Sequence, residues 1–147
     1  MPIKGVGIDL IRIHRVARAY RRRPERFLRR IFSRKEIEIL QHKKNLFPSL
    51  AARFAAKESI AKALGCGIGT VKWVELEILP GDKGQPIVFL HGNAGLWAEQ
   101  HRIKGVEVSM SHDGPYAVAK AIAYGDTKKQ PRSHCIETTG GGGSPDK

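Results

Sequence analysis

The sequence predicts an α+β domain in which a small antiparallel sheet packs against one long helix and several short helices. Three observations support this prediction. The run GVGIDLIRI at residues 5–13 has the composition of a buried strand, residues 50–64 read as an alanine-rich helix, and two later stretches alternate apolar and polar residues. A chain of 147 residues is long enough for one domain with an ordinary hydrophobic core.

The N-terminal half is predicted to hold one strand followed by four helices. The strand covers residues 3–10, and two basic helices follow it, separated near Pro24. The stretch SRKE at residues 33–36 has the spacing of a capping box, which begins a short helix that ends before the turn NLFPS. The longest helix, 50–64, is ended by the glycines of GCGIG.

The C-terminal half is predicted to form two hairpins around a short helix. Apolar and polar residues alternate with period two in residues 71–80 and 85–92, on either side of the turn GDKG. This pattern predicts that Leu76 lies on a buried face of the hairpin and Glu77 on the solvent-exposed face. A helix follows at 93–102, and a second hairpin pairs VEVSMSH with YAVAKAIAY across HDGP. The domain is expected to span residues 1–125, and the polar segment 126–147 to be a disordered tail.

The charge of the chain indicates an acidic partner. Lys and Arg number 26 against 14 Asp and Glu, a formal net charge of +12. Such an excess attracts nucleic acid, a membrane surface or an acidic protein. Apolar residues recur at helical spacing within the basic stretch 12–35, which favours two amphipathic helices over a solvated charge run. We expect this structured basic surface to dock onto an acidic helix.

Other classes of protein fit the sequence less well. No apolar stretch reaches the roughly 18 residues that span a bilayer. The N-terminus lacks the order of a signal peptide, so a cytoplasmic location is expected. Cys66 and Cys135 have neither a metal-site spacing nor a disulfide pattern, and both are interpreted as free thiols. An RNA-binding domain would explain the charge, but an aromatic content of 7% offers no stacking platform in the strands.

Two carboxylates stand inside elements that are otherwise apolar. Asp9 interrupts the first strand, and Glu58 lies on the helix RFAAKESIAKALG, whose circumference is mostly apolar. A buried carboxylate needs a cationic partner or a metal, and Mg2+ takes one or two carboxylates together with water and substrate phosphates. The plainer alternative is an intrahelical ion pair between Glu58 and Lys62, four residues later.

A hydroxyl and an imidazole stand near the end of the strand 106–112. Ser111 and His112 are suited to contact a phosphate, although a histidine in this position is more often a turn residue. The glycines of GCGIG lack the Walker and dinucleotide spacings and serve equally well to end a helix. Together with the two carboxylates, these residues predict a Mg2+ site for phosphate chemistry.

Four blocks occur in a characteristic order and spacing: GIDLIRIHRV, RFLRRIFSRKEIE, LAARFAAKESIAKALGCGIG and VSMSHDGPYAVA. Together they resemble the holo-acyl-carrier-protein synthases, the short bacterial type of 4'-phosphopantetheinyl transferase, over residues 3–124. The resemblance implies the fold of that family and a homotrimer with active sites at the subunit interfaces. It also implies Mg2+-dependent transfer of 4'-phosphopantetheine from coenzyme A to a serine of an apo acyl carrier protein.

The resemblance further implies roles for individual residues. Asp9 and Glu58 would hold Mg2+ with the coenzyme A pyrophosphate, and Lys62, the third catalytic residue, would neutralise phosphate charge. His112 and Ser111 would contact a coenzyme A phosphate. The candidates for holding the nucleotide are Arg53, Gly67 and Pro86. The predicted docking surface for the carrier consists of basic Arg15, Arg22 and Arg26 and apolar Phe27 and Phe54.

The implied reaction is attack of the carrier hydroxyl on the phosphorus attached to the pantetheine arm, with release of adenosine 3',5'-bisphosphate. The hydroxyl loses its proton to Glu58 or to a metal-bound water, and the sequence leaves both open. It also leaves open whether the carrier serves fatty-acid or polyketide synthesis. The alternative function is a noncatalytic basic module that docks on acidic helices or RNA, which gives Asp9 and Glu58 no role.

Overall fold

The computed structural model describes residues 1–127 and has the predicted α+β architecture. Its elements are β1 (Ile3–Arg12), α1 (Ile13–Arg22), α2 (Pro24–Ile31), α3 (Arg34–Gln41), α4 (Leu46–Leu64), the short 3-10 helix η1 (Trp73–Glu75), β2 (Leu76–Pro80), β3 (Pro86–Leu90), α5 (Gly92–Gln100), β4 (Ile103–Asp113) and β5 (Tyr116–Gly125). The tail was predicted to begin at residue 126. Its residues after 127 lie outside the described residues. Within residues 1–127, no helix is long and apolar enough to cross a membrane.

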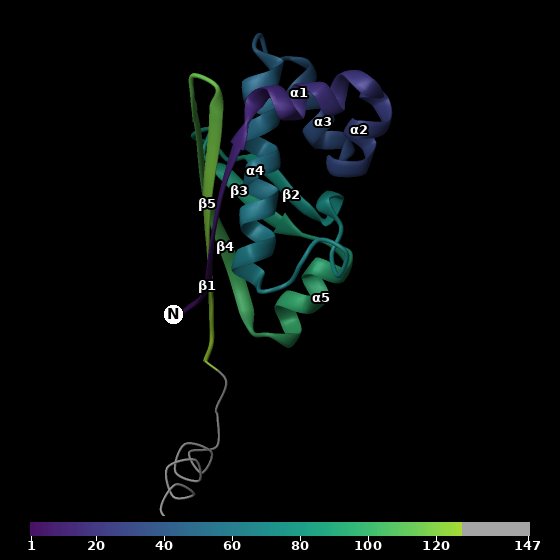
Figure 1. Ribbon diagram of the computed structural model, residues 1–147. Coiled ribbons are helices and arrows are strands. Elements are labelled where there is room, and N and C mark those ends of the chain that lie inside the picture. The colour runs from purple at the N-terminus through teal and green to yellow at the C-terminus, as the bar shows by residue number, and fades with distance from the viewer. Residues whose placement is uncertain (128–147) are drawn as a thin grey trace, which may run out of the picture.

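The long helix α4 lies along one face of a three-stranded sheet. The strand order is β1–β5–β4, with both pairings antiparallel, so β1 and β4 are the edge strands. Helices α1, α2 and α3 gather near the N-terminal end of α4, and α5 lies near its C-terminal end (Figure 1). Strands β2 and β3 form a separate two-stranded sheet. The main core lies between α4 and the inner face of the three-stranded sheet.

Strand β1 packs directly on the backbone of α4. A Cβ atom at Gly5 would collide with the carbonyl oxygen of Ala63, and one at Gly7 with that of Ser59. Glycine is therefore required at both positions for this close approach. Because side chains alternate along a strand, Asp9 points to the same side as Gly7 and is held beside α4.

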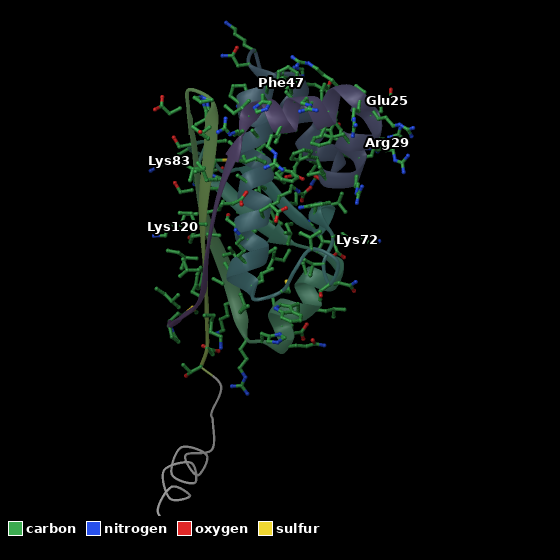
Figure 2. The ribbon with its side chains drawn as sticks, viewed as in Figure 1. Glu25, Arg29, Phe47, Lys72, Lys83 and Lys120 are labelled. Carbon is green, nitrogen blue, oxygen red and sulfur yellow. The ribbon has the colours of Figure 1, made fainter. Side chains whose placement is uncertain are left out.

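The face of β1 that points away from α4 is exposed to solvent. The sequence predicted a buried strand, and for this face that prediction is wrong in the single chain. Val6, Ile8 and Leu10 are 54%, 61% and 65% exposed. Lys120 of the neighbouring strand β5 also points away from α4 (Figure 2). The side of the sheet opposite α4 therefore carries a row of exposed apolar side chains along its edge.

The predicted helix signals are confirmed, with one boundary moved. The break between α1 and α2 falls at Pro24, both hydrogen bonds of the Ser33–Glu36 capping box form, and Gly65 ends α4 with a φ of 81°. Helix α4 begins at Leu46, four residues before the predicted start at 50. Pro48 is accommodated because the N–H groups of a first helical turn have no intrahelical partner.

The first predicted hairpin is shorter than expected, and one of its faces differs. Residues 73–75 form η1, so β2 starts at Leu76. Glu77 was predicted on a wet face but is only 7% exposed. Its carboxylate accepts a hydrogen bond from Oγ of Ser33 at 2.6 Å and lies 2.9 Å from Nε2 of His91. These distant partners, rather than water, satisfy Glu77.

Candidate active site

Asp9 and Lys62 meet where β1 crosses α4. The Asp9 side chain is 20% exposed, and its Oδ1 lies 3.5 Å from Nζ of Lys62. The same ammonium group donates a hydrogen bond to the carbonyl of Ile8 at 2.9 Å. Lys62 is thus fixed beside Asp9 by both contacts, and it supplies a cationic partner for the carboxylate of the first strand.

Glu58 lies one helical turn before Lys62 and lines the same hollow, of about 400 Å³, as Asp9. Burial raises the pKa of the Glu58 carboxyl and the negative charge of Asp9 raises it further, whereas Lys62 and the indole of Trp73 act in the opposite direction. Among the described residues, Lys62 forms its ion pair with Asp9 and not with Glu58. The alternative of an intrahelical Glu58–Lys62 ion pair is therefore wrong.

The two carboxylates are suited to hold a divalent cation. The repulsion that Asp9 exerts on ionised Glu58 would be relieved by a cation bound to both. Within residues 1–127 there is no group of three or more His, Cys, Asp or Glu side chains that could hold a metal ion. Two carboxylates fit Mg2+ that completes its shell with water and phosphate oxygens.

Basic and apolar side chains surround this hollow, which we call the carboxylate hollow. Arg15, Phe27 and Phe54, three of the predicted docking residues, line it. Arg22 lies beside Arg15 in a neighbouring depression. Arg26 faces an open concavity on α2, whose outer surface also carries the Glu25–Arg29 ion pair of 3.2 Å (Figure 2).

A second hollow, of about 340 Å³, contains most of the other predicted residues. Arg53, Pro86, Ser111 and His112 line it, and so does Lys43. Nη1 of Arg53 donates to the carbonyl of Ile78 at 2.9 Å, which fixes the guanidinium. Burial lowers the pKa of Arg53 and the charge of Glu36 opposes this change, but a guanidinium stays charged in proteins. The lining suits an anionic ligand, so we call it the basic hollow.

The carboxylate hollow and the basic hollow share no lining residue. Asp9 lies on edge strand β1, whereas Ser111 and His112 lie on β4 at the opposite edge, with β5 between them. A single chain therefore does not bring the predicted metal pair to the predicted phosphate contacts. Gly67 lines neither hollow and is exposed in the turn after α4.

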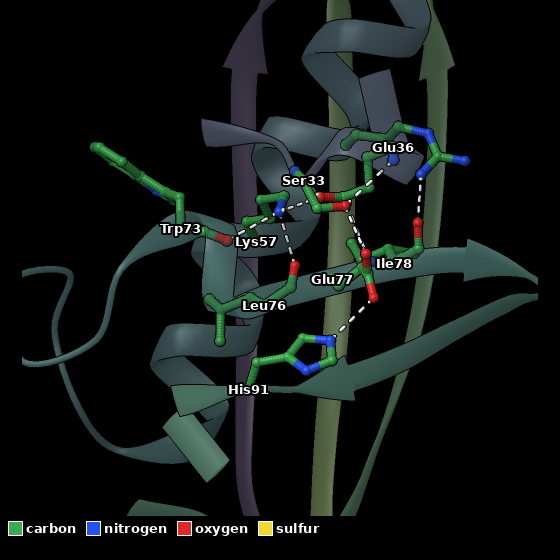
Figure 3. A network of polar contacts seen from close by, with 9 residues as sticks. Ser33, Glu36, Lys57, Trp73, Leu76, Glu77, Ile78 and His91 are labelled. Atoms are coloured by element: carbon green, nitrogen blue, oxygen red, sulfur yellow. Dashed lines mark hydrogen bonds and ion pairs between the residues drawn. The ribbon is translucent and has the colours of Figure 1, made fainter. Parts of the chain in front are cut away.

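A buried polar network lies beneath the site (Figure 3). Nζ of Lys57 donates to Oε1 of Glu36 at 2.8 Å, to the carbonyl of Trp73 at 2.9 Å and to the carbonyl of Leu76 at 2.8 Å. All three donors of this ammonium group are used. The network joins α4 to α3 and to the corner between η1 and β2, and so positions the stretch of α4 that carries Glu58.

Sequence comparison relates the chain to a transferase family. The family model for the 4'-phosphopantetheinyl transferase superfamily matches residues 5–121. A holo-[acyl-carrier-protein] synthase of Natranaerobius thermophilus is 43% identical over 124 residues, which is 84% of this chain and 99% of that protein. The chain belongs to the holo-acyl-carrier-protein synthase family of 4'-phosphopantetheinyl transferases. The resemblance inferred from the four sequence blocks is thereby confirmed.

Solved structures of holo-acyl-carrier-protein synthases share the fold. The enzyme from Neisseria meningitidis superposes with a TM-score of 0.78 at 31% identity, covering 84% of this chain and 99% of that one. The enzyme from Helicobacter pylori, solved in complex with coenzyme A, gives a TM-score of 0.72 at 29% identity, covering 81% and 99%. The predicted fold class is confirmed by these likenesses.

Sequence reasoning missed several residues of the site. Lys43 lines the basic hollow, and the pair of lysines in QHKKN was the available signal. Trp73 packs against Phe54, which lines the carboxylate hollow, with ring centroids 5.8 Å apart. Lys57 offered one signal, because a lysine on an almost wholly apolar helix needs a buried partner.

Proposed function

We propose that the chain transfers the 4'-phosphopantetheine group of coenzyme A to a serine hydroxyl of an apo acyl carrier protein, releasing adenosine 3',5'-bisphosphate. The observation that carries this proposal is the grouping of Asp9, Glu58 and Lys62 in one hollow. The names of the relatives and the coenzyme A complex of the Helicobacter pylori enzyme support the choice of substrates. A cytoplasmic location is part of the same proposal.

In this proposal Asp9 and Glu58 hold Mg2+, which when bound offsets the negative charge of the coenzyme A phosphates. Lys62, fixed by Asp9 and by the carbonyl of Ile8, presents its ammonium group to the same phosphates. The serine proton would be accepted by Glu58 or by a water molecule in the hollow, because a carboxylate that holds a cation binds a proton less tightly. The chain thus orients the phosphate and removes the proton from within one hollow.

The carrier would dock on helices α1 and α2. Arg15, Arg22 and Arg26 are exposed on these helices and offer positive charge to an acidic helix. Phe27 and Phe54 line the carboxylate hollow and offer apolar contact area. A carrier bound at this surface would lie beside Asp9 and Glu58, so its serine would not need to travel far.

We further propose that the complete site forms between copies of the chain, in a homotrimer. The basic hollow, which would take coenzyme A phosphates and nucleotide through Arg53, Pro86, Ser111 and His112, is separate from the carboxylate hollow in one chain. Gly67 would contribute from the turn after α4. The exposed apolar row of Val6, Ile8 and Leu10 offers surface that a second copy would cover.

Intact-mass spectrometry of an apo acyl carrier protein tests the reaction. The carrier is incubated with the chain and coenzyme A, in parallel with Mg2+ and with chelator. A gain of one phosphopantetheine mass that requires the metal is the expected result. No gain on several carriers, with the chain folded, would contradict the proposed reaction and favour a noncatalytic module that binds acidic helices or RNA.

Mixing two inactive variants tests the shared site. Glu58→Gln removes one member of the metal pair, and His112→Ala removes one group of the basic hollow. If each site combines residues of two copies, unfolding and refolding the two variants together restores transfer, because some sites then receive both intact halves. If the mixture stays as inactive as its components, the site belongs to a single chain.

A further inference from the structure

The indole of Trp73 has a polar group without a partner. Its Nε1 atom is covered from solvent and, among the described residues, is the one buried side-chain nitrogen or oxygen atom that lacks a hydrogen bond. Trp97 differs, because its Nε1 donates to the carbonyl of Leu64 at 2.8 Å. Buried donors are almost always paired, so an unpaired one needs an explanation, and a functional contact that another state completes is one.

The surroundings of Trp73 fix its ring against α4 beside Glu58. The ring packs against Phe54, one turn before Glu58, with centroids 5.8 Å apart and the ring planes tilted by 38°. The guanidinium of Arg30 lies 5.7 Å from the ring centroid. The main-chain carbonyl of Trp73 accepts from Lys57, the residue before Glu58, while the ring points away from that network (Figure 3). Two ring contacts and one main-chain hydrogen bond thus hold Trp73 next to the segment of α4 that carries Glu58.

We propose that Trp73 is a positioning residue for Glu58, donating its Nε1–H to the carboxylate when Glu58 engages the substrate-bound cation. This inference rests on the proposed function. A carboxylate offers two oxygens, so an N–H bound to one of them fixes the direction in which the other points. Carboxylates that ligate metals are commonly held by such a second hydrogen bond.

Substitution by phenylalanine separates positioning from packing. Trp73→Phe keeps an aromatic ring against Phe54 and Arg30 but removes the N–H. If the N–H makes no functional hydrogen bond, its removal should leave kcat unchanged. The variant should then be as stable as the original chain or more stable, because an unpaired buried donor is unfavourable. If it positions Glu58, we expect kcat to fall about 10-fold, with KM for coenzyme A and for the carrier unchanged. An unchanged kcat in the folded variant would overturn the inference.

The indole N–H signal in nitrogen-15 NMR supplies a readout that does not depend on turnover. The chain has two tryptophans, so Trp97→Phe is both the matched control and the background in which the remaining indole signal is that of Trp73. We expect this signal to move downfield when Mg2+ and coenzyme A are added. Adding Glu58→Ala to this background should abolish the movement at coenzyme A concentrations where calorimetry shows that this variant still binds coenzyme A.

The two measurements distinguish the inference from the proposed function. If the original chain transfers the group and Trp73→Phe has the same kcat, the inference is overturned but the proposed function is supported. No transfer by the original chain would overturn the function. The indole signal would then decide the inference alone: a signal that stays in place, or moves equally without Glu58, contradicts it.

Discussion

Lys57 and Glu36 form an ion pair that is closed to solvent on both sides. Nζ of Lys57 lies 2.8 Å from Oε1 of Glu36, and neither side chain has exposed surface. Burial lowers the pKa of Lys57, and the charge of Glu36 opposes this. The other oxygen of Glu36 accepts from the main-chain N–H of Ile78 at 3.0 Å. Each charge is tolerated in the interior only because the other is present.

Removing one partner should therefore destabilise the chain strongly. We expect Lys57→Met to lower the free energy of unfolding by about 3–5 kcal/mol, because the buried carboxylate of Glu36 loses its cation. Urea denaturation monitored by circular dichroism measures the change. The matched control is Lys62→Met on the same helix, where the lysine is 54% exposed and a loss below about 1 kcal/mol is expected. Equal losses for the two variants would contradict this interpretation.

The contact between β1 and α4 predicts a second effect on stability and site geometry. Gly7→Ala would push β1 away from the carbonyl of Ser59 and cost about 1–3 kcal/mol. The same shift would carry Asp9 away from Glu58 and weaken Mg2+ binding. Calorimetric titration with Mg2+ and coenzyme A measures the second effect. Gly67→Ala is the control for stability, since no atom lies within 4 Å of its added Cβ, and a loss as large as that of Gly7→Ala would refute the steric explanation.

Local signals explain how much of the fold the sequence predicted. Proline ends α1 because its ring is not accommodated inside a helix, and Pro24 therefore marks the break before α2. Ser33 and Glu36 satisfy each other's neighbouring N–H groups within four residues, so the start of α3 is readable without tertiary information. Gly65 takes a left-handed conformation that few other residues adopt.

Two errors of sequence-based prediction involve partners that are distant in the chain or absent from it. Glu77 is buried because Ser33, just before α3, and His91, just before α5, both contact its carboxylate. The alternation of Leu76 and Glu77 along the strand had predicted that the side chain of Glu77 faces solvent. The outward face of β1 is apolar although no residue of the same chain covers it. Asp9 and Glu58 could be singled out because each was chemically out of place in its own element, and both line one hollow.

The raised pKa of Glu58 predicts how stability depends on pH without metal. A carboxyl whose pKa is higher in the folded chain than its ordinary 4.5 favours folding most below that ordinary value. This contribution is lost as pH rises through the raised value. We expect Glu58→Gln to become more stable than the original chain over this interval, by less than about 1 kcal/mol because solvent screens the half-exposed group.

Urea denaturation at several pH values in chelator measures this difference. Glu99→Gln, at an exposed position on α5, is the matched control and should give no such trend. A difference between Glu58→Gln and the original chain that does not grow with pH would show that Asp9 and burial do not disfavour the ionised form.

The docking surface predicts a charge effect on carrier binding. Arg15→Glu places a negative charge at the rim of the carboxylate hollow and should weaken binding of an acidic carrier by about 10-fold or more. Binding of Mg2+ should be retained. Arg102→Glu, between α5 and β4, makes the same charge change elsewhere and should have little effect. Surface plasmon resonance at two salt concentrations measures both, and an equal loss would indicate a general charge effect rather than a docking site.

Single-turnover transfer by Asp9→Asn and Glu58→Gln tests the central claim most directly. Carrier phosphopantetheinylation is followed by intact mass, and carrier binding is measured on the same samples. The account predicts that both variants bind the carrier nearly as well as the original chain but transfer at least about 100-fold more slowly. Transfer at the original rate by either variant would contradict a reaction centred on these two carboxylates.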